Sequence, residues 1–468
     1  MADEAIALMA HLMRRAGFGA PYAELEARAA KGYEATVDEL LHPDSQPPLD
    51  TDIMMRYKTE WVNKNALEGQ QEEWVFRMIN TKRPLEEKIA LFWHGIFCTG
   101  HAKCENPRQQ MVEIDMFRQH GMGRFDDLLL RLAMDPAMVF YLDNCMSHKG
   151  AINENWGREL LELFSMGVGK DGQLNYTEDD VKEAARAFTG WTVANAIPRY
   201  PYGRYLSKFI YNPQDHDDGP KTFLGETGNW NGEDIIRIIS KQPATARFVS
   251  RHLYNFFVAD EPPVPAWQHT PPQDPEAIRQ LEEEYFRSNY NIGSMLRLLF
   301  NADWFKKARF ARVKSPVETV VGTMRLVGDM TFPKPGLNAI TLSIRYMGQD
   351  LLNPPTVEGW HTGKEWIDSG TLVERINFTA DQVGNINLPG VRAIIERLRA
   401  QGPTLTPEQL VDGCLKLLGH YELAEETRRE LVALARAEGE IQTGAEKFPQ
   451  RVAQMLQSIV ATTEYLFA

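Results

Sequence analysis

The chain has 468 residues, of which 43% are hydrophobic and 25% are charged, and its formal net charge is −13. This composition is typical of a globular protein with a large core and excludes a disordered chain. The acidic balance, without a basic stripe, argues against a nucleic-acid partner. Four cysteines without a CxxC pair exclude a disulfide-rich scaffold.

The N-terminal segment MADEAIALMAHLMRR places two acidic residues before a short apolar stretch and its arginines after that stretch. A secretory leader has the opposite order. No apolar run approaches the roughly 20 residues that a membrane-spanning helix needs. We therefore expect no membrane span and a cytoplasmic protein as the sequence stands, or an exported protein if a leader has been removed.

Helical periodicity dominates the chain and predicts an all-α fold. We expect a main helical domain over residues 1–395, with a central motif block at 136–232, and a C-terminal helical subdomain over 396–468. The helices are expected at 4–15, 22–30, 33–41, 84–98, 106–120, 124–134, 153–169, 176–191, 233–240, 243–259, 275–287, 292–301, 315–329, 389–400, 406–418, 422–438 and 447–466.

Three stretches lack the helical period and are rich in proline and glycine. Residues 193–232 are expected to form a long loop excursion that includes one small β-hairpin. Residues 260–274 are a proline-rich connector, and residues 347–378 are a loop that ends in a helix. Long loops of this kind in compact domains are often functional.

The helix around NENWGRELLELFSMGVG carries a polar face. Asn155, Glu159, Glu162 and Met166 share one side at helical spacing, with Arg158 beside them. Two carboxylates on one face can hold a cation or act as acid and base in a cavity. The alternative is a solvated face with an Arg158–Glu162 ion pair. We expect Gly167 and Gly169 to end this helix as left-handed caps.

The next helix repeats the arrangement with Asp179, Glu183 and Arg186, and Thr177 is its expected N-cap. A short turn joins the two helices, so they are expected to be antiparallel neighbours whose polar faces meet. Glu159, Glu162, Asp179 and Glu183 would then hold a hard divalent cation. The alternative is an exposed, salt-bridged face.

The excursion contains NPQDHDDGPK, where histidine and aspartates alternate. His216 is the candidate general base and Asp217 the residue that orients it. Lys221, with Arg158, would stabilise an anionic substrate or transition state. A local Asx-type turn is the alternative interpretation.

His94, Cys98, His101 and Cys104 are zinc-type ligands in number and kind, but their spacing fits no finger or ribbon pattern, so a buried helix with free thiols is favoured.

The loop NPPTVEGWHTGKEW carries Trp360 and Trp366, with His361 between them. These aromatic side chains would form either a platform for a sugar or a plug that packs onto the core, and the plug is favoured.

Several blocks, including HLMRRAGFGAP, ALFWHGIF, the central NENWGRELLELFSMGVG and MGQDLLNPPTVEGWHTGKEWI, resemble the bacterial family called domain of unknown function 1800. The resemblance implies little about activity. Members are often exported and encoded beside sulfatase-like proteins, which suggests a sulfatase-like partner. The chain departs from the family at Ile96, where a second histidine is common, and this weakens the zinc interpretation.

Two classes of function follow from these patterns. The first is a metal-assisted enzyme, a hydrolase or group-transfer enzyme for a saccharide-like polar substrate. The second is a non-enzymatic scaffold or partner protein for the sulfatase-like neighbour. Binding of a polysaccharide or cofactor without turnover is a third interpretation. No G-x-S-x-G elbow, Walker A loop or H-E-x-x-H motif is present.

Overall fold

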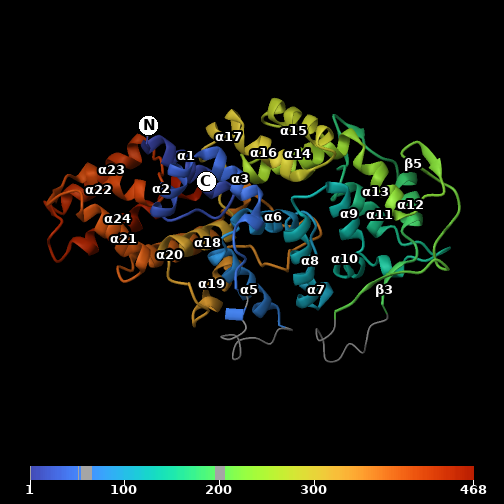
Figure 1. Cartoon of the computed structure of the whole chain (residues 1–468), viewed down its shortest axis with the longest axis horizontal. Helices are drawn as coiled ribbons and strands as arrows, with labels where there is room; N and C mark the ends of the chain where they lie inside the picture. The colour runs from blue at the N-terminus through green and yellow to red at the C-terminus, as the bar shows by residue number, and fades with distance from the viewer. Residues whose placement is uncertain (1, 51, 54–65, 195–205) are drawn as a thin grey trace.

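A computed structural model describes residues 2–50, 52–53, 66–194 and 206–468, and within them it confirms the all-α prediction (Figure 1). The helices are α1 (Ala2–Arg15), α2 (Tyr22–Lys31), α3 (Tyr33–Leu41), α5 (Leu67–Asn80), α6 (Pro84–His94), α7 (His101–Cys104), α8 (Pro107–His120), α9 (Phe125–Ala133), α10 (Pro136–Tyr141), α11 (Asn155–Glu162), α12 (Glu178–Ala187), α13 (Gly232–Ser240), α14 (Pro243–Phe257), α15 (Pro275–Arg287), α16 (Ile292–Asn301), α17 (Asp303–Lys307), α18 (Pro316–Val327), α19 (Leu337–Tyr346), α20 (Ser369–Gly384), α21 (Pro389–Arg399), α22 (Pro407–Leu417), α23 (Glu425–Ala437) and α24 (Phe448–Val460).

Short antiparallel strand pairs accompany the helices. The pairs are β1 (Gly169–Lys170) with β2 (Gln173–Leu174), β3 (Trp191–Val193) with β4 (Phe209–Tyr211), β5 (Lys221–Phe223) with β6 (Glu226–Gly228), and β7 (Thr404–Leu405) with β8 (Ile441–Gln442). Two pairs lie at or within the predicted excursion, where one hairpin was expected: β3, at its start, pairs with β4 in its middle, and β5 pairs with β6 nearer its end.

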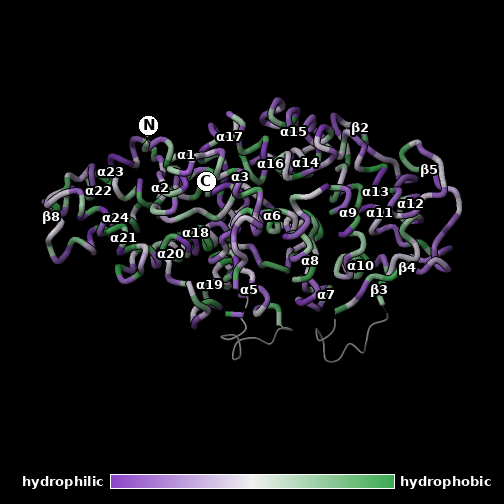
Figure 2. The backbone as a smooth tube through the Cα atoms, in the orientation of Figure 1, coloured by the Kyte–Doolittle hydropathy of each residue, from purple (hydrophilic) through white to green (hydrophobic). Residues whose placement is uncertain are grey.

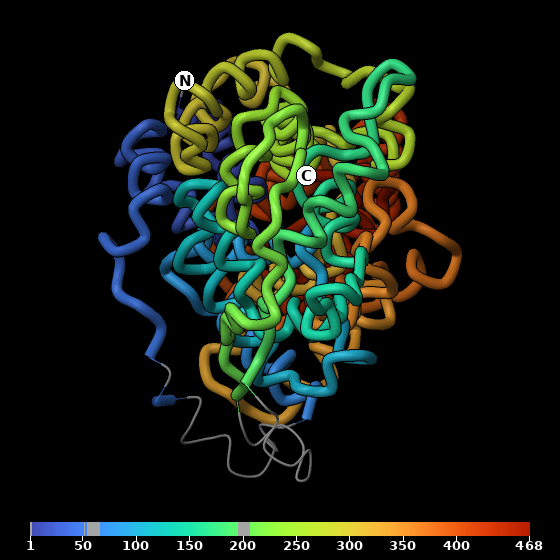
Figure 3. The backbone as a smooth tube through the Cα atoms, turned by 90° about the vertical axis from the view of Figure 1, so that its right-hand side faces the viewer, coloured from blue at the N-terminus to red at the C-terminus, as the bar shows by residue number. Residues whose placement is uncertain are grey.

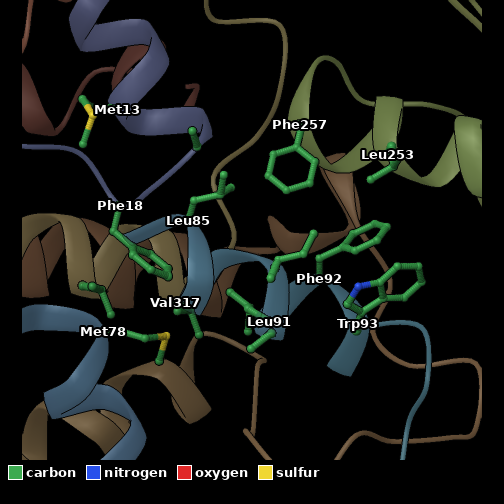
Figure 4. Packing of buried hydrophobic residues seen from close by; sticks show 14 of the residues in the cluster. Met13, Phe18, Met78, Leu85, Leu91, Phe92, Trp93, Leu253, Phe257 and Val317 are labelled. Atoms are coloured by element: carbon green, nitrogen blue, oxygen red, sulfur yellow. The ribbon is translucent and has the colours of Figure 1, made fainter. Parts of the chain in front are cut away.

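The core runs through the middle of the molecule, where α1, α5, α6, α14 and α18 meet. Met13, Phe18, Phe92, Phe257 and Val317 from these and adjoining segments pack together there (Figure 4). Hydrophobic and hydrophilic residues alternate along the helices, as amphipathic packing requires (Figure 2). In the described ranges, no helix is both long and apolar enough to cross a membrane.

The two ends of the molecule differ in structure. α21 to α24 form one end, beside α1 and α2, whereas α9 to α13 and the β3–β4 and β5–β6 hairpins form the other (Figure 1). Figure 3 looks at the hairpin end, with the remaining helices stacked behind it. The predicted domain boundary at residue 395 falls inside α21, and α24 packs against α20 as well as α22. The division into two domains stays a prediction.

Besides the short α7 and α17, two longer helices of the described residues, α5 and α19, lie where no helix was predicted. In α5, the polar residues Gln70, Gln71 and Glu72 are buried together with Trp74 and Phe76, so polar residues occupy core positions and obscure the helical period. The helix α19 follows a proline- and glycine-rich turn, which breaks the pattern before it. Polar residues at buried positions weaken the apolar period on which the prediction of a helix from sequence depends.

The helix α11 ends earlier than predicted. The helix stops at Glu162, and a tight turn follows in which Met166 N donates to Leu161 O at 3.0 Å. Gly167 has the predicted left-handed conformation, with φ of 71°. Gly169 does not cap the helix, because it begins β1. The predicted Thr177 cap of α12 is confirmed, as a capping box with Asp180.

Candidate functional site

A cavity of about 880 Å³ opens between α6, α14, α15 and three loop segments, residues 162–171, 263–275 and 349–366. This volume lies within the range of small-molecule sites, roughly 300–1,000 Å³. Its aromatic lining residues are Phe92, Phe248, Phe256, Trp267, Trp360 and Trp366, and we call it the aromatic cavity.

The tryptophans of the aromatic cavity are held by neighbouring rings and cations. The Trp267 ring centroid lies 4.6 Å from that of His252 on α14, and the Arg251 guanidinium lies 4.5 Å from the same ring. Trp360 packs edge-on against His94 at 5.2 Å. Trp366 is buried, as the plug interpretation expects, whereas Trp360 is half-buried and lines the cavity.

Residues 349–366 are anchored to the core by hydrogen bonds to the segment's backbone. Leu352 N donates to His94 Nε2 at 3.1 Å, and Gln110 Nε2 donates to Leu352 O at 2.8 Å. Gly359 has φ of 86°, and a Cβ there would lie 2.5 Å from Gly95 O. Glycine is therefore required where this wall of the cavity touches the loop after α6.

These contacts also correct the zinc interpretation. The Nε2 atom of His94 accepts the Leu352 amide, and burial lowers the pKa of His94 to about 3. Cys98 lies beyond the end of α6 and donates its thiol to His94 O at 3.1 Å, and burial raises its pKa. Cys104 faces Ala137 O. All four cysteines are free. His94 and Cys98 therefore serve to stabilise the wall of the cavity.

The carboxylates of the central helix lie beside the aromatic cavity. Glu162 lines it, and Glu358 lines it from the loop segment. Burial, and next the negative charge of Glu162, raise the pKa of Glu159 to about 7; Glu358 adds to this effect and Arg158 opposes it. In the described part of the chain, no hydrogen bond or ion pair joins the Glu159 or Glu358 carboxylate to another side chain. Glu159 can therefore hold or release a proton near neutral pH.

The predicted meeting of polar faces between α11 and α12 is wrong. The two helices are neighbours, but they touch through Gly157, whose Cβ would lie 2.9 Å from Val181 O and 3.0 Å from Ala185 N. Small residues occupy this contact because the backbones come close. Of the polar residues of α12, Glu178 reaches Arg158 of α11, whereas the predicted ligands Asp179 and Glu183 do not face Glu159 and Glu162.

Arg158 and Asp179 lie on the outer surface. Arg158 Nη2 pairs with Glu178 Oε2 at 2.7 Å, and not with Glu162 as the simplest alternative expected. The Asp179 side chain is 92% exposed and lies 3.9 Å from Lys182. Neither residue lines the aromatic cavity.

Glu183 and Asp217 meet through Arg186, and we call these three residues the Arg186 cluster. Arg186 Nε donates to Asp217 Oδ2 at 2.8 Å, and Nη1 donates to Glu183 at 2.9 Å. Hydrogen bonding to Arg186 lowers the pKa of Asp217 to about 2. The cluster joins the excursion to α12.

His216 and Lys221 complete the same junction. His216 is buried, with Nδ1 2.9 Å from Thr189 O. Lys221 is also buried, and its Nζ donates to the backbone carbonyls of Asp217 and Gly219. Asp217 does not orient His216, because its carboxylate is engaged by Arg186. These contacts favour the interpretation of this segment as a local turn over its interpretation as a general base with an orienting carboxylate.

The structure does not bring the predicted metal ligands together. No group of three or more His, Cys, Asp or Glu side chains suited to a metal ion occurs in the described ranges. Glu159 and Glu162 lie at the cavity, Asp179 on the surface and Glu183 in the Arg186 cluster. Of the eight predicted catalytic and metal residues, Glu162 alone lines the aromatic cavity.

Sequence reasoning missed Glu358 and Trp267 as lining residues. Glu358 lay inside a loop that was noted for its tryptophans, and Trp267 inside a stretch interpreted as a connector. The proline-rich composition of residues 260–274 was the available signal, because such a long irregular segment inside a compact domain is often part of a site.

Comparisons with known proteins identify a family without an assigned activity. No curated protein and no solved structure matches the chain. One protein family matches it over residues 11–467, nearly the whole length, as the resemblance of the sequence blocks predicted. The chain therefore belongs to the family described as "Protein of unknown function (DUF1800)".

Proposed function

We propose that the protein is a hydrolase or group-transfer enzyme for a saccharide-like substrate that binds in the aromatic cavity. The observation that carries the proposal is the pair Glu159 and Glu162, one turn apart beside a cavity with three tryptophans. Sugar rings pack well on aromatic faces, and paired carboxylates with different protonation are the usual means of glycosidic cleavage.

The two carboxylates have complementary roles in the proposed reaction. The protonated Glu159 donates its proton to the oxygen that leaves as the glycosidic bond breaks. Water adds to the sugar carbon and gives its proton to the Glu162 carboxylate, which is steadied by the Tyr176 hydroxyl at 3.4 Å. A carboxyl with a pKa near 7 is suited to proton donation at neutral pH.

The test uses the full chain and a panel of oligosaccharides. Calorimetry measures binding, and the appearance of new reducing ends measures hydrolysis. We expect Glu159→Gln and Glu162→Gln to lower the rate by about 100-fold or more while binding persists. Asp179→Asn, on the exposed side of α12, is the matched control and should keep the wild-type rate.

Two outcomes would contradict the proposal. One is that no oligosaccharide binds, and the other is that Glu159→Gln keeps its full rate. A rate that depends on added divalent cation and disappears with a chelator would instead favour the metal-assisted mechanism.

The scaffold for a sulfatase-like partner is the competing proposal. It requires Glu159 to hold helices together and His216 to be dispensable. The lack of a partner for the Glu159 carboxylate in the described residues and the burial of His216 favour the enzyme. Co-purification with a sulfatase-like protein, together with unfolding of Glu159→Ala, would support the scaffold.

We propose a cytoplasmic location, with which the four free thiols are compatible.

A further inference from the structure

The deepest arginines that line the aromatic cavity already have partners within the chain. Arg251 Nε donates to Glu261 Oε2 at 2.8 Å, and the face of its guanidinium lies on Trp267. Arg312 Nη1 donates to both carboxylate oxygens of Glu318, at 3.0 and 2.8 Å. The buried Arg251–Glu261 pair is self-contained, so its charges largely cancel inside the wall. Arg312 shares the buried Glu318 with Lys88 and Arg15, and Asp260 lies 3.8 Å from Arg312 Nε as a second carboxylate of this cluster.

The two outer arginines are paired as well. Arg247 Nε lies 3.6 Å from Glu282 Oε1. Arg279 forms ion pairs with Glu276 and with Glu283. None of the four lining arginines is thus left to neutralise a negatively charged ligand without giving up an existing partner.

The acidic side of the cavity is different. Within the described ranges, the Glu358 carboxylate has no ion pair or side-chain hydrogen bond, and Glu162 has only the long hydrogen bond from Tyr176. Glu365, by contrast, is paired with His361 at 2.7 Å. The walls therefore present two carboxylates that no cation of the described chain neutralises.

Lys170 is the remaining cation of the lining, and it lies at the rim. Its side chain is 54% exposed, and Nζ is 3.9 Å from Asp171 Oδ2. Burial is the main cause of the raised pKa of Glu159, and the negative charges of Glu162 and Glu358 add to it, which places the three carboxylates near one another.

We infer that the aromatic cavity selects a positively charged ligand, with amino sugar units as its class of substrate. Glu358 and Glu162 attract the ammonium group, and the half-buried ring of Trp360 adds cation–π attraction. Glu358 acts as a specificity residue, separate from the Glu159–Glu162 pair. This inference rests on the proposed function for the identity of the site.

Three matched oligosaccharides test the inference at constant ionic strength and at a pH where amines are protonated. They are an oligomer of glucosamine, its neutral N-acetylated counterpart and an oligomer of a uronic acid. We expect the glucosamine oligomer to bind about tenfold more tightly than the neutral one and to weaken as salt is added. The uronic acid oligomer should bind weakest.

Glu358→Gln should weaken binding of the charged oligomer by about tenfold and change binding of the neutral oligomer by less than about twofold. Glu365→Gln is the matched control, because its carboxylate is already paired. Equal binding of all three oligomers, or preference for the uronic acid, would overturn the inference. If the neutral oligomer is nevertheless cleaved, the proposed enzymatic function stands although the inferred preference for a positively charged ligand fails. If nothing binds, both fail.

Discussion

Gly157 on α11 lies against Ala185 on α12, where a Cβ added to the glycine would be 3.2 Å from the Ala185 Cβ and 2.9 Å from Val181 O. This contact sets how α11 sits on α12 and therefore where Glu162, which lines the aromatic cavity, and its neighbour Glu159 lie. Gly157→Ala should lower the free energy of unfolding by about 1–3 kcal/mol, because the helices must separate.

Urea denaturation measures that change. Gly444→Ala is the control, because a Cβ there meets no atom within 4 Å. Equal stability of Gly157→Ala and wild type would show that the helix contact tolerates a methyl group, and the geometry argued for Glu159 would lose its explanation.

Glu318 on α18 is expected to be essential for stability. Burial opposes its ionisation, yet the charges of Arg312, Lys88 and Arg15 hold its pKa well below the ordinary value. Glu318→Gln leaves these buried cations without a counter-charge and should cost about 3–5 kcal/mol. Chemical denaturation checks this, with Glu178→Gln as a surface control that should stay near wild type. A loss no larger than that of the control would refute the prediction.

The wall of the cavity gives a test that links shape to binding. Gly359→Ala should weaken ligand binding by about tenfold or more, because its Cβ would lie 2.5 Å from Gly95 O and push residues 349–366 away. Gly439→Ala introduces comparable backbone strain at φ of 80° in open space and should leave binding unchanged. Calorimetry with an oligosaccharide compares the two, and equal effects would count against the proposed wall.

Asp217 gives a pH-dependent prediction for the Arg186 cluster. Its pKa of about 2 means that the folded state favours the ionised form, so its contribution is present above the ordinary value near 4 and is lost as the pH falls towards 2. Because water screens this partly exposed ion pair, Asp217→Asn should cost about 1 kcal/mol at neutral pH and progressively less in acid. Melting temperatures of both proteins between neutral and acidic pH measure this. A difference that does not shrink in acid would contradict the assignment.

Glu159 should show the opposite dependence. Its pKa is raised to about 7, so the folded state binds the proton more tightly and stability falls as the pH rises from the ordinary value near 4.5 through 7. Glu159→Gln should match wild type in acid and become the more stable protein above neutral pH. Paired melting curves test this, with Asp179→Asn as a control that should show no such trend.

The positions of most helices were predictable because their buried faces recur at helical spacing, as in α9, α14 and α16. The N-cap at Thr177 was also predictable from the sequence, since a capping box depends on two residues three positions apart. The helix α5 was not, because its burial on several sides comes from partners distant in sequence. The same limit applies to the aromatic cavity, whose walls come from segments between residues 91 and 366.

By itself, the amino-acid sequence determined the helical class, the family and the presence of carboxylates at one face of the central helix, because these depend on local spacing and on whole blocks of residues. Only the tertiary structure decided which of those carboxylates share a site. The packing left Asp179 of α12 exposed, Arg186 engaged Asp217 and Glu183, and the fold brought Glu358 to the cavity that Glu162 lines. Long-range packing makes these choices, and no local pattern encodes them.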